Sequence, residues 1–428
     1  MKKKVISLLL AATMLTTIFT GCGEKKREEK KEKSESGAVV LDMYHSWSTD
    51  TERGAALDKL IQEFNEENKG EIEIKVTVNP DFPAYQEKVK TMISTDTTPD
   101  IFHYNFNPND LSRQKSGKLM DFSKFLDEDW KARFGDGDLE NLTIDGQVLS
   151  IPFEKAGAVL YYNKELFANT GIDEFPKTWD EMIEVCKKLK DNGITPFSLY
   201  TADDAWYTCN LFTYLAASYM GTDILNKGGD INTSEMKEAA KKLREFWDYT
   251  TADAIGANYS VAMNNFASGK TAMVIDGPWL IGSLSEISDK IGIAQVPTFG
   301  DGKVAENYIV TDAQTPWAAA KTDDKEKEEA IVKFMKYITS EESVKQLTLE
   351  GAVFLSPKLD MEDAEVKGTK GLLGEYLALN SKVEDSTVNI QRNLSTTANS
   401  KLPSLLEGLF IDNMTAEEFV EQLAAENK

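Results

Sequence analysis

The hydrophobic residues beyond position 38 follow strand and helix patterns in turn. Residues 39–43 form a short apolar run, residues 55–64 place apolar positions at helical spacing, and residues 72–78 alternate strictly between apolar and polar. A second stretch of helical spacing at 85–93 leads into a strand-like run at 99–104. This succession predicts a mostly parallel β-sheet that is covered by helices.

The remainder of the chain carries more helical than strand pattern. A helix pattern from Asn264 ends near Gly269, and a predicted strand at 271–275 and a turn at 276–279 follow it. Ligands of open parallel sheets bind beyond the carboxyl ends of the strands, so the residues directly after predicted strands are the first candidates for a site. Apolar residues spaced three and four apart predict further helices at 179–189, 235–249, 325–339 and 415–425.

Length and charge narrow the class of protein. A chain of 428 residues is longer than one hydrophobic core usually organises, so we expect two domains. Its content of 41% hydrophobic and 28% charged residues is typical of a globular protein. The net charge of -23 argues against a nucleic-acid partner, which requires clustered lysine and arginine, and it favours a neutral ligand.

The N-terminus has the pattern of a targeting segment. Three lysines precede an apolar run at 5–19, which ends at Thr20, Gly21 and Cys22. This resembles a bacterial lipoprotein signal, which implies removal of residues 1–21 and a lipid anchor on Cys22 at the outer face of the cell membrane. The alternative is an ordinary secretory signal with an incidental cysteine. The charged residues that follow, within 22–37, predict a flexible tether.

The sequence gives little support for catalysis that depends on histidine or a metal. Its two histidines, His45 and His103, have no metal-binding spacing, and neither a nucleophile elbow nor a phosphate-binding glycine loop is present. We therefore expect no metal and no cofactor. A glycosidase stays open as an alternative, because its two carboxylates need no fixed spacing in the sequence.

Tryptophans in turn-rich contexts are the strongest candidates for ligand contact. Sugars present flat apolar faces that suit aromatic rings, and hydroxyl groups that suit carboxylate and amide side chains. A single tryptophan is more often a packing residue, whereas two or more that line one cleft favour a sugar site. The four in such contexts are Trp47, Trp206, Trp279 and Trp317.

Several motifs then resemble one family in the expected order along the chain. The last of them predicts a helix start in which Thr415 is the N-cap and Glu418 completes a capping box. Together they resemble extracellular solute-binding proteins of ABC importers, of the maltose- and oligosaccharide-binding type. The motifs are TPDIF (98–102), IPFE (151–154), LYYNKELF (160–167), FPKTWDE (175–181), GKTAM (269–273), DGPW (276–279) and NMTAEE (413–418).

This resemblance implies a two-lobe α/β fold of the periplasmic-binding-protein type. Each lobe would be a mostly parallel sheet flanked by helices, and the ligand would lie between the lobes. We expect residues 38–147 and 292–335 in the first lobe, and residues 148–291 and 336–428 in the second. The hinge would cross between them near 146–150, 290–294 and 334–340.

The resemblance also implies which residues contact the ligand. Trp279 matches the family's stacking tryptophan, and Asp276 belongs to the same turn. Trp206 lies where the family places an aromatic residue in the second lobe, and Glu154 lies close to a family contact. The full set that we expect at the ligand is Trp47, Ser48, Asp50, Tyr104, Asn105, Glu154, Trp206, Asp276, Trp279 and Trp317.

The function implied is capture of a carbohydrate, in particular an oligosaccharide, and its delivery to an importer. The partners would be the transmembrane permease subunits and their cytoplasmic ATPase, and the binding protein itself would be a monomer without catalytic activity. Two alternatives stay open at this point: a binding protein for another solute, such as a polyol or a peptide, and a surface glycosidase.

Overall fold

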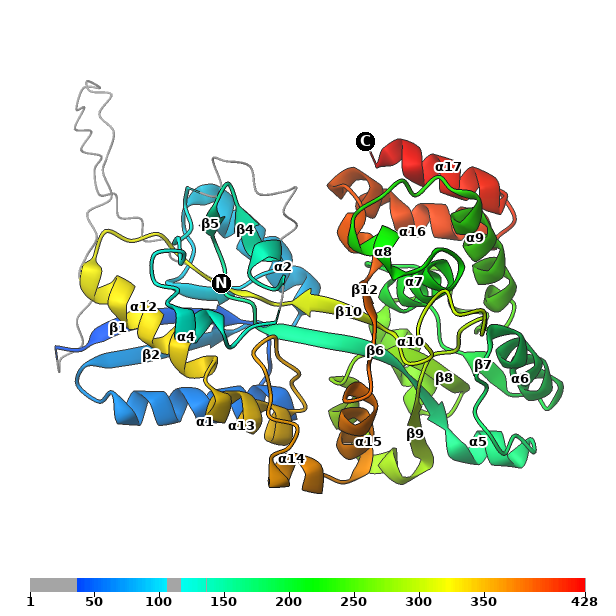
Figure 1. Cartoon of the computed structure of the whole chain (residues 1–428), viewed down its shortest axis with the longest axis horizontal. Helices are drawn as coiled ribbons and strands as arrows, with labels where there is room; N and C mark the ends of the chain where they lie inside the picture. Colours follow the sequence, from blue (N-terminus) through cyan, green and yellow to red (C-terminus); the bar gives the residue numbers. More distant parts are fainter. Residues whose placement is uncertain (1–36, 106–116, 136, 428) are drawn as a thin grey trace, which may run out of the picture.

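The computed structural model describes residues 37–105, 117–135 and 137–427, which form two α/β lobes side by side (Figure 1). The predicted signal segment, Cys22 and nearly all of the tether lie outside the described residues. Within the described residues, no helix is long and apolar enough to cross a membrane. Cys186 and Cys209 are both buried and do not form a disulfide.

The first lobe is built on a four-stranded sheet in the order β11-β3-β1-β2. Strands β2, β1 and β3 are parallel, as predicted, and β11 joins the edge of β3 in the antiparallel direction. The elements of this lobe are β1 (Val39–His45), α1 (Glu52–Glu67), β2 (Ile72–Val78), α2 (Phe82–Thr95), β3 (Ile101–His103), α4 (Glu128–Lys131), the 3-10 helix η1 (Glu140–Leu142), β4 (Thr143–Ile144), β5 (Gln147–Val148), β11 (Trp317–Ala319), α12 (Lys325–Ile338) and α13 (Glu341–Gly351).

The alternation of side chains along β1 explains why helices cover both faces of this sheet. Leu41 and Met43 join the core formed with α1 and α12, whereas Tyr44 points to the other face and packs with α2. Tyr85 on α2 donates its hydroxyl to the carbonyl oxygens of Tyr44 and His103 at 2.9 and 2.6 Å. These bonds fix α2 against the carboxyl ends of β1 and β3, where ligand-facing loops are expected.

The second lobe is built around the long strand β6 (Glu154–Asn163). Its sheet has the order β12-β10-β6-β8-β7, and β9 also pairs with β6. The other elements are α5 (Lys164–Asn169), α6 (Trp179–Asp191), β7 (Thr195–Phe197), α7 (Trp206–Met220), α8 (Thr222–Asn226), α9 (Ser234–Trp247), α10 (Tyr259–Ala267), β8 (Thr271–Asp276), α11 (Leu280–Ser283), the 3-10 helix η2 (Ser285–Lys290), β9 (Ile291–Ala294), β10 (Ile309–Gln314), α14 (Ala364–Gly368), α15 (Gly371–Asn380), β12 (Ser386–Val388), the 3-10 helix η3 (Ile390–Asn393), α16 (Thr396–Phe410) and α17 (Ala416–Glu426).

The two-lobe α/β class is therefore confirmed, but the second sheet is mixed rather than mostly parallel. Strand β6 runs antiparallel to β8, β9 and β10. The predicted capping box at the start of α17 is present, since Thr415 accepts from the Glu418 backbone and Glu418 accepts from the Thr415 backbone. A second capping box, of Thr178 and Glu181, begins α6.

The lobe boundaries differ from the predicted ones because of long-range pairing. Strands β9 and β10 pair with β6, so residues 291–314 belong to the second lobe and not to the first. Helix α13 packs on α1, where a Cβ at Gly351 would lie 3.1 Å from the Ala56 Cβ atom, so the first lobe continues to Gly351 and does not end at residue 335. Each lobe thus contains segments that are far apart in the sequence.

Three segments cross between the lobes, and they are hydrogen-bonded to one another. Ile151 pairs with Trp317, and Glu154 pairs both with Gln314 and with Leu355. The crossings therefore lie near 151–154, 314–317 and 352–358 instead of near the predicted 146–150, 290–294 and 334–340. Figure 1 shows β6 and β10 passing together from one lobe to the other.

Candidate ligand-binding site

The loop after β1 turns tightly into α1, and its geometry depends on a glycine. The Thr51 side chain caps the helix by accepting from Gly54 N at 3.2 Å, and Thr51 N donates to Ser48 O at 3.0 Å. A Cβ at Gly54 would lie only 1.9 Å from Ser48 O, so only glycine allows the loop to lie this close to the helix. The turn leaves Ser48 partly exposed and Asp50 exposed.

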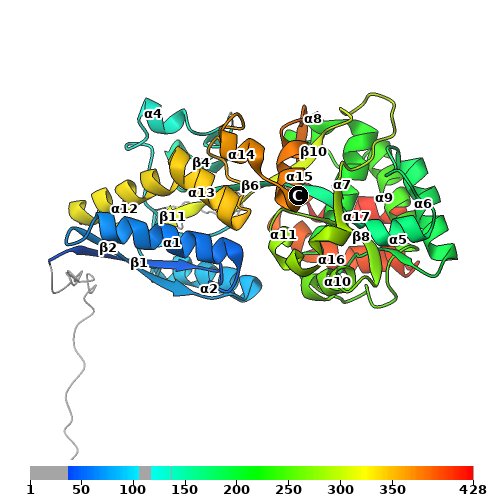
Figure 2. The ribbon, with the colours of Figure 1, turned by 90° about the horizontal axis from the view of Figure 1, so that it is seen from below.

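The start of α1 also meets the second lobe. A Cβ at Gly282 in α11 would lie 3.2 Å from the Glu52 Oε2 atom, so the Glu52 carboxylate lies against the backbone of α11. Figure 2 shows α11 at the side of the second lobe that faces the first. The loop at 46–51 and the turn at 276–279, which directly precedes α11, are therefore neighbours across the boundary between the lobes.

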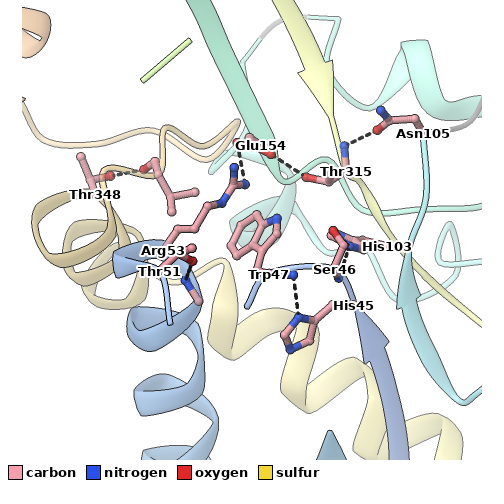
Figure 3. Close-up of polar contacts among 12 residues, drawn as sticks. His45, Ser46, Trp47, Thr51, Arg53, His103, Asn105, Glu154, Thr315 and Thr348 are labelled. Atoms are coloured by element: carbon pink, nitrogen blue, oxygen red, sulfur yellow. Dashed lines mark hydrogen bonds and ion pairs between the residues drawn. The ribbon is translucent and has the colours of Figure 1, made fainter. Parts of the chain in front are cut away.

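Arg53 connects this loop to the crossing segments (Figure 3). Its guanidinium carbon lies 4.0 Å from the centroid of the Trp47 ring, and its Nη2 atom is 2.9 Å from Glu154 Oε1. The side chain of Glu154 is only 3% exposed and that of Arg53 is 20% exposed. A carboxylate this deeply buried requires a partner, and Arg53 supplies the positive charge.

Thr315 joins the same network from the second crossing segment. Its hydroxyl donates to Glu154 Oε2 at 2.8 Å, and its backbone N donates to Asn105 Oδ1 at 2.6 Å. Its φ of 44° is in the left-handed region, which is unfavourable for a β-branched residue. The hydrogen bonds that Thr315 donates to Glu154 and Asn105 hold this strained residue where β10 leaves the second lobe.

A buried aromatic cluster lies beneath the loop. The imidazole of His103 stacks on Trp317 with centroids 5.0 Å apart, and Trp47 contacts His103 edge-on at 5.9 Å. The backbone N–H groups of Ser46 and Trp47 donate to His103 Nε2 and His45 Nδ1 at 3.0 and 3.2 Å. Both histidines must therefore be neutral to hold the loop in this conformation.

Burial accounts for the neutral state of the two histidines. Burial and, to a lesser extent, the positive charge of Arg53 together lower the pKa of His45 to about 4. For His103, burial is again the main cause of a pKa well below its ordinary value, followed by His45 and Arg53. Sequence reasoning did not predict the role of the two histidines in shaping the loop.

In the second lobe, Trp206 at the start of α7 contacts Trp279. Their ring centroids are 5.2 Å apart, and both side chains are partly exposed. The Trp279 ring lies over the turn, because a Cβ at Gly277 would be 2.4 Å from its Cη2 atom. A glycine at 277 is therefore necessary for this ring position.

Asp276, at the end of β8, is buried beneath the two tryptophans. Its Oδ2 atom accepts a short hydrogen bond from the Tyr207 hydroxyl and one of 3.2 Å from Tyr259, while its Oδ1 atom accepts from Gly277 N at 2.7 Å. Burial raises the pKa of Asp276 to about 7, and hydrogen bonds from these groups and from Trp279 limit the rise.

The structure divides the ten predicted contact residues into exposed and buried groups. The exposed or partly exposed group comprises Ser48, Asp50, Tyr104, Asn105, Trp206 and Trp279. The others are buried in this structure, where packing leaves at most 4% of each residue exposed. They are Trp47, Glu154, Asp276 and Trp317.

Two cavities lie away from these residues. One of about 410 Å³ is lined by Arg244, Asp412 and Met414, between α9 and the turn before α17. The other, of about 290 Å³, lies beside Arg133 and Pro357, near the third crossing. In the described part of the chain, no group of three or more histidine, cysteine or acidic residues is placed to hold a metal ion.

Fold comparison defines the class of protein. A solved structure from a study of xylan utilisation by the thermophilic bacterium Caldanaerobius polysaccharolyticus matches with a TM-score of 0.77 and 24% identity, over 91% of this chain and 100% of that one. This likeness places the chain in the two-lobed solute-binding fold. Residues 47–345 match the bacterial extracellular solute-binding proteins, and the chain belongs to this family.

Two relatives show how far the similarity extends. The multiple sugar-binding protein of Streptococcus mutans is 24% identical over 79% of this chain and 79% of its own length. An uncharacterised ABC transporter extracellular-binding protein of Pyrococcus horikoshii is 24% identical over 66% of this chain and 65% of its own length. Members of this family bind solutes, which agrees with the prediction of a binding protein.

Proposed function

We propose that this protein captures a carbohydrate, in particular an oligosaccharide, between its two lobes and delivers it uncleaved to an ABC importer. The observation that carries this proposal is the pair of partly exposed tryptophans, Trp206 and Trp279, next to the contact between α11 and α1. Aromatic rings with an exposed face suit the apolar C–H face of a sugar ring.

Polar residues of the first lobe would bind the sugar hydroxyls. Ser48 and Asp50 lie in the loop that approaches α11, and Tyr104 and Asn105 follow β3. Carboxylate and amide groups form the paired and charge-assisted hydrogen bonds that sugar hydroxyls accept and donate. The buried residues Trp47 and Glu154 would then support these contacts without touching the sugar.

The relatives support both the ligand class and the transport role. The name of the Streptococcus mutans relative refers to sugars, and that of the Pyrococcus horikoshii relative refers to an ABC transporter. We propose the corresponding partners here, namely a pair of permease subunits and a cytoplasmic ATPase. We also propose that the protein is a monomer, held at the outer face of the membrane by a lipid on Cys22.

A thermal-shift screen against a panel of mono- and oligosaccharides tests the ligand class. A sugar that binds only the native state at one hundred times its Kd stabilises that state by about 2.7 kcal/mol, which raises the melting temperature. Trp279→Ala should weaken binding of the best sugar by on the order of 2–4 kcal/mol while the protein stays folded. Trp247→Ala is the matched control, because Trp247 stacks on Phe410 and should affect stability only.

The outcomes separate the alternatives. Recovery of the oligosaccharide intact after incubation supports a binding protein, and recovery of shorter products identifies a glycosidase. A panel in which no sugar shifts the melting temperature, while a polyol or a peptide does, would replace the carbohydrate with another solute. Unchanged affinity in folded Trp279→Ala would remove Trp279 from the site.

A further inference from the structure

Asp276 was predicted to touch the ligand, but its surroundings indicate a different role. The residue is fully buried at the end of β8, and its two carboxylate oxygens bond to Tyr207, Tyr259 and the Gly277 backbone. A side chain without an accessible surface acts on a ligand only through its neighbours. Two neighbours reach the surface, Tyr259 and Trp279, and Trp279 is the one expected to stack on a sugar.

Three contacts fix the position of the Trp279 ring. The turn beneath it is held by the Gly277 N–H, which donates to Asp276 Oδ1 at 2.7 Å. The six-membered ring of Trp279 lies directly over Gly277, and the carbonyl oxygen of Gly277 accepts from Tyr161 on β6 at 2.9 Å. Trp206 completes the set from α7.

We propose that Asp276 is a positioning residue whose ionised carboxylate holds Trp279 in its sugar-stacking orientation, so that protonation of this one carboxyl weakens ligand binding. This inference rests on the proposed carbohydrate function. An ionised carboxylate only accepts hydrogen bonds, and here two tyrosine hydroxyls and the N–H of Gly277, which lies under the Trp279 ring, converge on it. A protonated carboxyl turns one oxygen into a donor, so one of these donors loses its acceptor, and loss of the Gly277 bond releases the turn that holds Trp279.

The groups that face Asp276 leave the carboxyl itself as the group that titrates near neutral pH. Four tyrosines surround it, from α7, α10, β6 and the segment before α7, and burial raises the pKa of each well above its ordinary value of 10. They are Tyr207, Tyr259, Tyr161 and Tyr200. A second carboxyl, Asp204, is exposed at the surface and accepts from the Tyr200 hydroxyl at 3.1 Å. Desolvation by the surrounding protein raises the pKa of Asp204 too, so it must be tested separately.

Tryptophan fluorescence of the unliganded full-length protein tests the network without any sugar. Between pH 5.5 and 8.5 we expect a single step with a midpoint near 7, in line with the pKa of Asp276. The step should be absent in Asp276→Asn and Trp279→Phe, and it should persist in Asp204→Asn and in Trp130→Phe, which lies in the core of the first lobe. A step that survives in folded Asp276→Asn, or its absence from the wild-type protein, overturns the inference.

Sugar affinity supplies the second readout. We expect the Kd of the wild-type protein for maltotriose or xylotriose, whichever binds, to rise on the order of fivefold from pH 8 to pH 6, the lower end of usual coupling between sites. In Asp276→Asn the Kd should not change with pH. If a sugar binds and its Kd is equally flat in the wild-type protein, the inference is wrong. If no sugar binds, the carbohydrate function fails, and the fluorescence step alone decides the role of Asp276.

Tyr259→Phe keeps the test valid if Asp276→Asn does not fold. The Tyr259 hydroxyl donates to the ionised carboxylate and lowers its pKa, so its removal should move the fluorescence midpoint to higher pH. A purely structural role of Tyr259 would change the melting temperature and leave the midpoint in place. An unmoved midpoint in folded Tyr259→Phe therefore counts against Asp276 as the titrating group.

Discussion

Replacing Arg53 with methionine leaves the Glu154 carboxylate buried without its cation. Removal of one partner from a fully buried pair destabilises a protein by about 3–5 kcal/mol. Because the Arg53 side chain keeps 20% of its surface exposed, we expect the lower end, about 3 kcal/mol. Part of this loss, about 0.5–1 kcal/mol, comes from the guanidinium that covers the Trp47 ring.

The complementary change, Glu154→Gln, should be milder. The amide oxygen can still accept from Thr315, and the Arg53 guanidinium can be hydrated, so we expect the free energy of unfolding to fall by about 1.5 kcal/mol. In the double variant no charge is left unpaired. Its loss of unfolding free energy should therefore be about 2 kcal/mol smaller than the sum of the losses in the two single variants. The free energies of unfolding come from urea titrations, in which the transition of the first lobe is fitted on its own.

An exposed ion pair of the same lobe provides the control. Lys59 and Glu350 join α1 to α13 with side chains 51% and 44% exposed, so their double-mutant cycle should show a much smaller coupling than that of Arg53 and Glu154. If the Arg53 and Glu154 losses simply add, the pair does not act as a unit. The idea that it ties the ligand loop to the crossing segments is then wrong.

Three further predictions follow from other parts of the molecule. The mature protein should begin at a lipidated Cys22 and partition into detergent, whereas Cys22→Ala should stay unlipidated, and mass spectrometry of an unmodified Cys22 in native protein would contradict this. Saturating ligand should reduce the radius of gyration measured by small-angle scattering, because contacts from both lobes favour a closed arrangement; an identical radius with confirmed binding would place the ligand on one lobe. Because its pKa is low in the folded protein, His45 contributes about 3 kcal/mol to the free energy of unfolding above pH 6.5, and this contribution is lost as the pH falls towards 4. His45→Asn should remove this contribution from the dependence of stability on pH. Asp276 acts in the opposite sense: its contribution to the free energy of unfolding is complete below pH 3.8 and is lost as the pH rises through 7. The quantity to measure is therefore the difference in free energy of unfolding between the wild-type protein and His45→Asn at each pH.

Local rules made much of the fold predictable. The strict alternation at 72–78 corresponds to β2, and the helix pattern at 179–189 corresponds to the first three turns of α6. The capping box at Thr415 was predictable because both of its partners lie within four residues. Patterns of this kind depend on neighbours in the sequence, which are visible without a structure.

Features that depend on distant partners were not predictable in the same way. The lobe boundaries were wrong because β9 and β10 pair with β6, and no local pattern specifies that partner. The left-handed conformation of Thr315 is imposed by Glu154 and Asn105, and a threonine gives no sign of it. Arg53 lies in the first turn of an ordinary amphipathic helix, and only the folded chain shows its contacts with Trp47 and Glu154.

The three crossings have a consequence for the order in which the chain folds. Trp317 in β11 pairs with His103 in β3, about 210 residues earlier, so synthesis from the N-terminus leaves this edge of the first sheet open until β11 has been made. The core of the second lobe is likewise incomplete until α16 and α17 have been synthesised, because their apolar faces are part of it. Neither lobe is therefore a foldon that the nascent chain can complete early. An unpaired strand edge is a site of aggregation, so the late closure of the β3 edge exposes the incomplete chain to wrong pairing until Trp317 is in place.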